Sequence, residues 1–328
     1  MFVSYKLQVT SYKLQATNHM NTLLIVDGNG LMHRAFHALP PFKTARGVPT
    51  QVVYGFFSIL YKSIADFQPT HVLVCFDTPA PTFRNKLHKE YQSQRPKIAD
   101  DFITQIPMVK EALDAAKIVH VELDGYEGDD VIGTAAKKAE KQGFTVLILS
   151  GDKDMMQLVN EHVSTVTPDI GFSTTKVYTP AAVLEKMGVL PEKIIAYKAL
   201  AGDSSDNYKG ADGIGPKTAK KLLDEFGTLE GILENVDKLP EGKIKQSIKD
   251  NIENIKVGKL LATIMTSAPV EIPLENTQWI GFIEPLREKL LEFEMYSLIA
   301  RLFPKKKKIE DRKQKTEKEI NKDQMSMF

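Results

Sequence analysis

Nine acidic residues stand where strands or helices are expected to begin or end. Three apolar runs typical of buried strands lead directly into aspartates, which are Asp27, Asp77 and Asp152. The carboxyl ends of parallel strands meet at one edge of a sheet, so these side chains should converge there. Six further acidic residues follow the same pattern: Glu127, Asp129, Asp130, Asp154, Asp203 and Asp206. The sequence therefore predicts a crowded acidic pocket.

A pocket of this kind points to bound metal ions. Crowded carboxylates cannot all stay ionised without a cation among them, because each neighbouring charge and each lost water favours protonation. Hard divalent cations such as Mg²⁺ or Mn²⁺ prefer oxygen ligands. Residues three apart share a helix face, so Glu127 with Asp130, and Asp203 with Asp206, can each point to one place. For a single aspartate such as Asp129 or Asp203, the alternative is helix capping.

Strand and helix patterns alternate between residues 20 and 180, with helices expected over 51–67, 102–116 and 129–142. Alternation implies an α/β domain with a mostly parallel central sheet flanked by helices. A long connection over about residues 78–101 contains three prolines, and long connections tend to be functional. Helical patterns dominate residues 181–303, which predicts a second, helical domain. Residues 1–19 contain a duplicated segment and are expected to be a disordered extension.

A glycine-rich turn lies within the second domain, before a helix expected over 218–226. Gly213 and Gly215 would let backbone N–H groups approach a phosphate, and the helix N-terminus adds partial positive charge. With Lys217 and Thr218 beside it, the turn favours a nucleic-acid backbone. It lacks the phosphate-loop spacing of nucleotide triphosphate sites. The alternative is a plain turn between two helices.

The overall composition is that of an ordinary globular protein, with 43 basic and 42 acidic residues. Without the nine candidate ligands only 33 acidic residues remain, so the rest of the surface is basic and suits a polyanion. The single cysteine, Cys75, excludes an intramolecular disulfide and a zinc site of several thiolates, and favours a cytoplasmic setting. No apolar run approaches the ~20 residues that span a bilayer, so no membrane partner is expected.

The polar, basic segment 304–328 is expected to be a disordered tail. Its end resembles the bacterial sliding-clamp peptide, in which a glutamine and two intervening positions precede an aliphatic–aromatic pair. The matching residues are Gln324, Met327 and Phe328. A disordered arm with a short apolar anchor is a sensible tether to such a clamp, and an unstructured end is the alternative.

Several motifs in order resemble the 5′-nuclease (flap endonuclease) family, and most closely the N-terminal 5′-to-3′ exonuclease domain of bacterial DNA polymerase I. The resemblance runs from about residue 22 to 303. The motifs are Val26–Asn29, Arg34, Phe76–Asp77, Thr82–Arg84, Glu127–Asp130, Gly151–Asp154 and Gly202–Asn207. This resemblance implies a PIN-like, resolvase-like catalytic domain with a helical arch over residues 78–101. It also implies a C-terminal helical domain whose helix-hairpin-helix-like turn binds DNA.

The family's activity implies a structure-specific 5′ nuclease, both 5′-to-3′ exonuclease and flap endonuclease, that processes DNA flaps and RNA primers in replication and repair. Similar enzymes use two or more Mg²⁺ ions in two-metal catalysis. A monomer in the cytoplasm, associated with the nucleoid, is expected. One ion would lie nearer Asp27, Asp77, Glu127 and Asp129 or Asp130, and the other nearer Asp152, Asp154, Asp203 and Asp206.

The resemblance also assigns residues to the substrate. Arg34, Arg84 and Arg95 would contact the scissile phosphate, since arginine suits bidentate phosphate contacts. Tyr91 would stack on an unpaired base. The alternative interpretation is that Tyr91 is simply a half-buried aromatic residue. A K⁺ ion at the Gly213–Gly215 turn is suggested by the resemblance alone.

Gln92 departs from the family pattern, in which a catalytic lysine commonly follows the aromatic residue. Glutamine can donate a hydrogen bond to a phosphate but cannot offset its charge. We therefore expect a slower chemical step, or substitution by Lys89 or Lys97. Gln92 favours one alternative function, a weakly active or non-catalytic branched-DNA-binding protein of the same fold. A second alternative, a single-strand ribonuclease of the PIN-like fold, fits the helical domain poorly.

Overall fold

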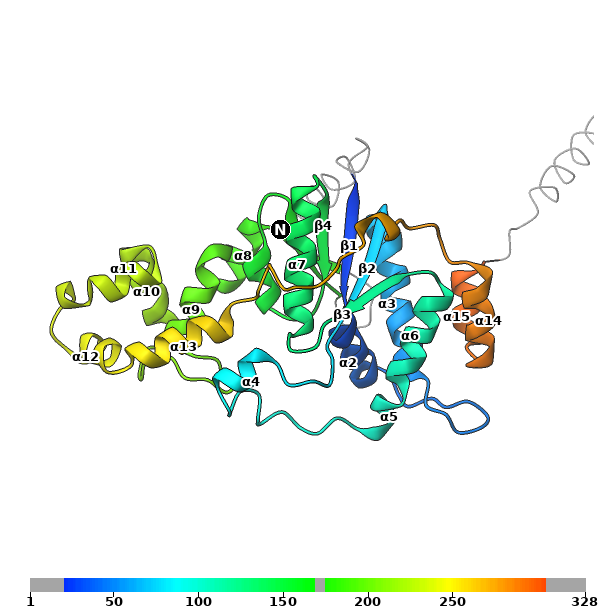
Figure 1. Ribbon diagram of the computed structural model, residues 1–328, viewed down its shortest axis with the longest axis horizontal. Coiled ribbons are helices and arrows are strands. Elements are labelled where there is room, and N and C mark those ends of the chain that lie inside the picture. Colours follow the sequence, from blue (N-terminus) through cyan, green and yellow to red (C-terminus); the bar gives the residue numbers. More distant parts are fainter. Residues whose placement is uncertain (1–20, 169–174, 305–328) are drawn as a thin grey trace, which may run out of the picture.

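The structure is a computed structural model that describes residues 21–168 and 175–304 (Figure 1). The predicted N-terminal extension and the tail peptide with Gln324, Met327 and Phe328 lie outside the described residues. No helix in the described part of the chain is long and apolar enough to cross a membrane.

Six strands form one sheet in the order β3-β2-β1-β4-β5-β6. Their bounds are Thr22–Asp27 for β1, His71–Phe76 for β2, Val119–Glu122 for β3, Thr145–Leu149 for β4, Val163–Pro168 for β5 and Thr175–Tyr178 for β6. All neighbours are parallel except β5 and β6. The predicted mostly parallel sheet is confirmed. Because β1 lies between β2 and β4, successive connections leave it on opposite sides, which opens a crevice at its carboxyl end.

Helices cover both faces of this sheet, so its central strands are apolar throughout. One face carries α2 (Gly28–Ala38), α3 (Gln51–Phe67) and α6 (Gln105–Ala115), and the other carries α7 (Gly128–Lys141). Helix α2 lies so close to α3 that a side chain on Gly55 would meet the Ala35 Cβ at 2.4 Å. Packing in the hydrophobic core therefore fixes the positions of the helices that end near the acidic residues at the edge of the sheet.

The helix expected over 102–116 is in fact two helices, α5 (Asp100–Ile103) and α6. Pro107 lies in the first turn of α6, where its missing N–H costs nothing, and it disfavours a continuous helix through the preceding residues.

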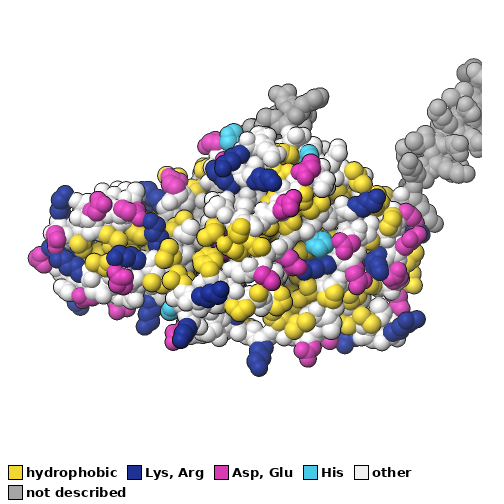
Figure 2. Space-filling view, viewed as in Figure 1, with side chains coloured by type: hydrophobic (Ala, Val, Ile, Leu, Met, Phe, Trp, Pro, Cys, Tyr) yellow, Lys and Arg dark blue, Asp and Glu magenta, His cyan; other side chains and the backbone are white. Residues whose placement is uncertain are grey.

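The helical part follows the sheet. Its α-helices are α8 (Pro180–Met187), α9 (Ile194–Ala201), α10 (Pro216–Phe226), α11 (Leu229–Glu234), α12 (Lys243–Asp250) and α13 (Ile252–Ala262). Short 3-10 turns cover Asp154–Leu158 (η1), Pro191–Lys193 (η3), Val236–Lys238 (η4) and Leu274–Asn276 (η5). In Figure 1 helices α10 to α13 extend to one side of the sheet, and Figure 2 shows charged side chains of both signs over them.

The end of the predicted helical domain needs correction, because the chain returns to the sheet after α13. Ile264, Ile272 and Leu274 pack against the α7 side of the sheet. The last two helices, α14 (Glu284–Glu292) and α15 (Tyr296–Leu302), add Leu286 and Leu298 to the core around α3 and α6. Their apolar side chains thus belong to the first domain's core, although they lie more than 100 residues beyond its last strand.

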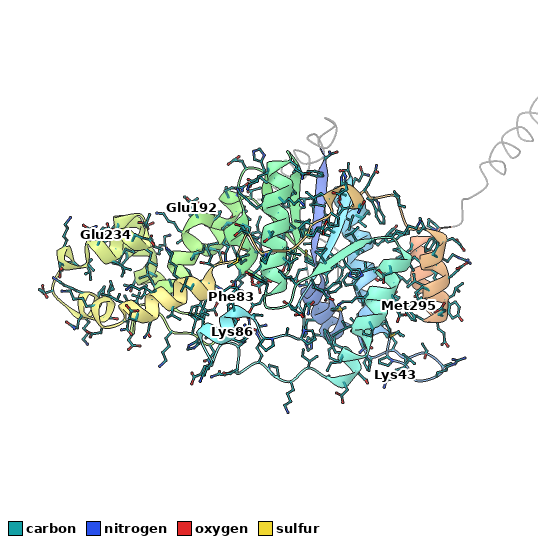
Figure 3. The ribbon with its side chains drawn as sticks, viewed as in Figure 1. Lys43, Phe83, Lys86, Glu192, Glu234 and Met295 are labelled. Atoms are coloured by element: carbon teal, nitrogen blue, oxygen red, sulfur yellow. The ribbon has the colours of Figure 1, made fainter. Side chains whose placement is uncertain are left out.

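The predicted arch is only partly helical. It contains α4 (Phe83–Leu87), then consecutive turns, then an extended stretch that reaches α5. Figure 3 shows Phe83 and Lys86 of α4 between the helical part and the sheet. This segment therefore connects the two halves of the molecule.

Candidate functional site

Four carboxylates, which we name the sheet-edge group, meet at the carboxyl ends of β1, β2 and β4: Asp27, Asp77, Asp129 and Asp152. Asp27 ends β1 and caps α2, accepting hydrogen bonds from the Gly30 N–H (2.7 Å) and the Ser150 hydroxyl (2.6 Å). Asp77 follows β2 and accepts one from the Gly128 N–H at 2.6 Å. Strand order thus brings together acids that are at least 23 residues apart in the sequence.

The electrostatics of the sheet-edge group call for a cation. Burial, opposed by the Ser150 hydrogen bond, raises the pKa of Asp27 to about 6. Burial and the charges of Asp152 and Asp27 raise the pKa of Asp129 well above its ordinary value. No salt bridge joins any of the four acids to a lysine or arginine within the described ranges. No ion pair among the described residues therefore offsets the mutual repulsion of these four carboxylates.

A second cluster, the helix-side group, consists of Asp154, Asp203 and Asp206, whose carboxylate oxygens lie within 4.8 Å of one another. Lys198 of α9 forms ion pairs with Asp154 and with Asp203, the latter at 2.5 Å. The Asp203 pKa is lowered because hydrogen bonds from Lys198 and Ser205 outweigh burial. Sequence reasoning missed Lys198, whose only signal was a lone lysine in an apolar helix.

The base of the arch is bonded to the loop that carries the helix-side group. Gln92 donates to the Asp206 carboxylate at 3.1 Å from its side chain, and its backbone N–H donates to the Asp206 carbonyl at 3.0 Å. Arg95 donates to the same carboxylate at 2.9 Å while its side chain stays 58% exposed. The Asn207 amide reaches back to the Glu90 carbonyl at 2.8 Å. Hydrogen bonds thus join the arch to the loop that carries Asp206.

Arg84 and Asp130 do not stand where the sequence predicted. Arg84 is 2% exposed and Asp130 is fully buried, and they form a bidentate pair at 2.7 and 2.8 Å. The Arg84 guanidinium also donates to the carbonyls of Leu261 and Thr263. Asp130 further accepts from two backbone N–H groups, those of Glu127 and Met265. In this structure Arg84 and Asp130 therefore join α4, α7 and the end of α13, rather than standing free for a phosphate or a metal ion.

Tyr91 is 4% exposed and packs against Tyr208, Leu261 and Ala262. Its hydroxyl donates to Glu127 at 3.3 Å. In this structure the Tyr91 ring is therefore packed inside the protein rather than exposed as the predicted base-stacking face. Glu127 lies between this hydroxyl and Arg84, and burial raises its pKa to about 7.

Arg34 lies on α2 near the sheet-edge group. It donates to the Pro168 carbonyl at 2.5 Å, and its Nη1 lies 3.9 Å from where a Gly151 side chain would begin. Its Nε is buried with no hydrogen-bond partner among the described residues. The arginine is thus held beside the turn that carries Asp152.

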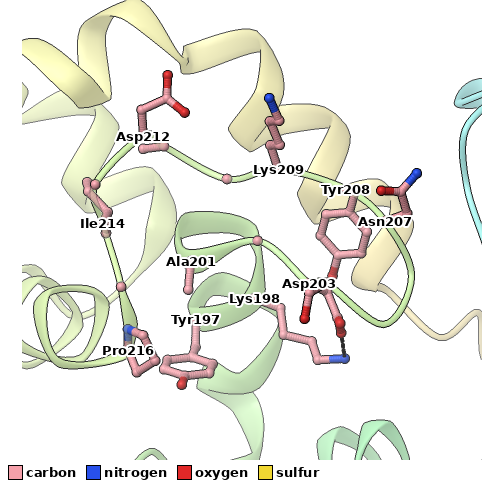
Figure 4. A pocket seen from close by; sticks show the side chains of 16 residues that line it. Tyr197, Lys198, Ala201, Asp203, Asn207, Tyr208, Lys209, Asp212, Ile214 and Pro216 are labelled. Atoms are coloured by element: carbon pink, nitrogen blue, oxygen red, sulfur yellow. Dashed lines mark ion pairs between the residues drawn. The ribbon is translucent and has the colours of Figure 1, made fainter. Parts of the chain in front are cut away.

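The glycine-rich turn lines one wall of a cavity of about 800 Å³ (Figure 4). Lys198, Asp203 and Tyr208 line it as well. Gly213 has φ +75°, and a side chain on Gly213 or Gly215 would project into open space. Helix α10 begins with Pro216, and Lys217 at its first turn is exposed. The turn thus presents backbone and a helix N-terminus to solvent next to the helix-side group.

Comparison with known proteins identifies the chain. The family model described as "5'-3' exonuclease, N-terminal resolvase-like domain" matches residues 22–188, and "5'-3' exonuclease, C-terminal SAM fold" matches residues 189–284. The chain belongs to the 5′-3′ exonuclease family. The 5'-3' exonuclease of Aquifex aeolicus is 40% identical over 281 residues, which are 85% of this chain and 94% of that protein. DNA polymerase I of Bacillus subtilis is 45% identical over 260 residues, 79% of this chain, and the chain spans only 30% of that relative.

Solved structures of other proteins share the fold of this chain. The T5 D15 protein co-crystallised with metal ions has a TM-score of 0.65 and 20% identity, covering 85% of this chain and all of that one. The catalytic core of Rad2 in complex with DNA substrate has a TM-score of 0.56 and 16% identity, covering 87% and 93%. The predicted α/β fold with a C-terminal helical domain is thereby confirmed.

The two acid groups of this exonuclease-family chain fit divalent metal ions. Both offer hard carboxylate oxygens, the donors that Mg²⁺ and Mn²⁺ prefer. The raised pKa values of Asp27 and Asp129 reflect negative charge that a cation would relieve. In the helix-side group the Lys198 ammonium forms ion pairs with Asp154 and Asp203. These ion pairs show that a positive charge is favourable beside the three carboxylates.

Proposed function

We propose that this chain is a metal-dependent, structure-specific 5′ nuclease that hydrolyses DNA phosphodiesters at flaps and single-stranded 5′ ends. One observation carries the proposal: the two groups of carboxylates adjoin each other, since the Asp154 N–H donates to the Asp152 carboxylate at 2.8 Å. The helix-side group also adjoins a cavity lined by the exposed glycine turn. In a protein that only bound polyanions, concentrated carboxylates would repel the phosphate that must approach them.

The sheet-edge group, with Glu127, would hold one Mg²⁺ and the helix-side group the other, Mn²⁺ being a substitute. Divalent ions bound there supply a water of lowered pKa and stabilise charge on the phosphate. Arg95 is the arginine best placed to contact that phosphate, since more than half of its side chain is exposed. Arg34 would steer the neighbouring phosphate from the side of Asp152. Gln92 would hold Asp206 in place, a task for which a neutral amide is enough.

Residues 20–180 would carry catalysis and the helical part from residue 181 would track the duplex. Gly213, Gly215, Lys217 and Thr218 would hold a DNA phosphate, with a K⁺ ion at the Gly213–Gly215 turn as a bridge. Such backbone contacts read no sequence, as suits an enzyme that recognises structure.

The biological setting follows from this activity. We propose that the chain acts as a monomer on 5′ flaps and RNA primers during replication and repair, in the cytoplasm and near the nucleoid. The tail residues Gln324, Met327 and Phe328 would bind a sliding clamp, which raises the local concentration at replicated DNA.

Cleavage of a 5′-end-labelled flap substrate tests the proposal. Release of the label should require Mg²⁺ or Mn²⁺ and stop with EDTA. Asp152→Asn should lower the rate more than about 100-fold, since even partners of metal ligands are worth 10–100-fold. Asp114→Asn is the matched control, because this exposed aspartate pairs with His120 away from the site. Tight flap binding without cleavage under any metal would contradict the proposal and favour a non-catalytic DNA-binding protein.

A further inference from the structure

Tyr208 carries a buried hydroxyl with no hydrogen-bond partner among the described residues. The residue is 6% exposed, and its ring packs in a cluster with Tyr91, Leu261 and Ala262. Helix α13 approaches it closely, since a side chain on Gly258 would meet the ring at 3.5 Å. A buried hydroxyl without a partner costs free energy, on the order of 1–3 kcal/mol. Packing alone would be served by phenylalanine.

The hydroxyl faces the helix-side group. Tyr208 and Asp203 form a two-residue antiparallel bridge, each donating its N–H to the other's carbonyl at 3.0 Å. Residues directly opposite in such a pair project their side chains to the same side. Figure 4 shows the Tyr208 ring beside Asp203, and both residues line the cavity.

We propose that the Tyr208 hydroxyl is an outer-sphere partner of a hydrated divalent cation held by Asp154, Asp203 and Asp206, and positions that ion's bound water. A phenol oxygen accepts a hydrogen bond while its own proton donates. Water on a divalent cation is a strong donor, and Mg²⁺ keeps several of its waters in proteins. The oxygen of Tyr208 would therefore accept a hydrogen bond from a water molecule of that ion. This inference rests on the proposed function and deepens it.

Tyr208→Phe isolates the hydroxyl, because it leaves the packed ring in place. Mg²⁺ alone is titrated into DNA-free protein by calorimetry, in an Asp129→Asn background that weakens the sheet-edge group. The Tyr208→Phe variant should bind Mg²⁺ roughly tenfold more weakly, because mutating a group that hydrogen-bonds to a metal's ligands typically lowers metal affinity by at least this factor. The unfolding temperature of the metal-free protein should stay equal or rise, since an unpaired buried hydroxyl has been removed. Tyr178→Phe, in a separate apolar cluster and 7% exposed, is the matched control.

The outcomes of this titration distinguish a role of the Tyr208 hydroxyl in metal binding from a purely structural role. Equal Mg²⁺ affinity in the Tyr208→Phe and parent proteins would overturn the inference while leaving the proposed function intact. Weaker binding together with a lowered unfolding temperature would make the hydroxyl a structural element and also overturn it. If the parent protein binds no more Mg²⁺ than an Asp203→Asn variant, the helix-side group is no metal site, and the proposed function fails with it.

Discussion

The two acid groups contain the same residue type but are balanced differently. In the sheet-edge group the described residues provide no ion pair, and burial raises the Asp27 pKa to about 6. In the helix-side group Lys198, Gln92 and Arg95 all donate to carboxylates, and the Asp203 pKa is lowered. Asp154 lies between the two and keeps a pKa raised to about 6, mainly through burial. Among the described residues, the sheet-edge group has no paired cation, whereas the helix-side group is paired with Lys198 and Arg95.

Asp130 belongs to neither group, and breaking its pair with Arg84 should have the largest effect. Arg84→Met leaves a fully buried carboxylate without its cation, so the free energy of unfolding should fall by about 3–5 kcal/mol. Arg95→Met, which removes a mostly exposed cation, should cost less than about 1 kcal/mol. Urea unfolding measures both. Similar losses in the two variants would contradict the structural role assigned to Arg84.

The stability of the metal-free protein should depend on pH through the sheet-edge group. The folded pKa values of Asp27 and Glu127, about 6 and about 7, exceed those of an unfolded chain, so the folded state binds more protons. These two carboxyl groups should therefore lower the free energy of unfolding progressively as pH rises from about 4 to about 7, by roughly 3 kcal/mol for Asp27 alone.

Urea unfolding in EDTA at several pH values measures this dependence, and Mg²⁺ should abolish most of it. Asp27→Asn should flatten the profile, whereas Asp203→Asn should not, because the Asp203 pKa is lowered rather than raised. A profile that Asp203→Asn flattens more than Asp27→Asn would reverse the comparison between the groups.

The smallest expected effect concerns the cation of the helix-side group. Lys198 occupies the carboxylates that a metal would use, so Lys198→Met should tighten Mg²⁺ binding to DNA-free protein, by roughly tenfold for each 1.4 kcal/mol of repulsion removed. Calorimetric titration measures it. Lys193→Met is the matched control, since Lys193 donates to the Leu223 carbonyl instead. Unchanged or weaker binding would show that Lys198 does not compete with metal.

Much of the site was predictable because it depends on local pattern. Strands that end in aspartate converge whenever the sheet is parallel, so Asp27, Asp77 and Asp152 could be grouped from sequence. The arch contacts were less accessible, since nothing in the sequence near Gln92 indicates that its side chain meets Asp206. The burial of Arg84 and Tyr91 was not predictable for the same reason, because a motif gives the residue type and order but not the burial of the side chain.

The sequence by itself determined the apolar strands, the acids that follow them and the glycine turn, because these depend on periodicity and backbone geometry over short stretches. Only the tertiary structure decided which acids remain available. It buried Asp130 against Arg84, set Lys198 between Asp154 and Asp203, and turned the Tyr208 hydroxyl toward the same group. Whether a carboxylate meets a cation, a backbone N–H or solvent depends on the packing of residues far apart in the chain. That packing, driven by burial of the shared core, has no local signature.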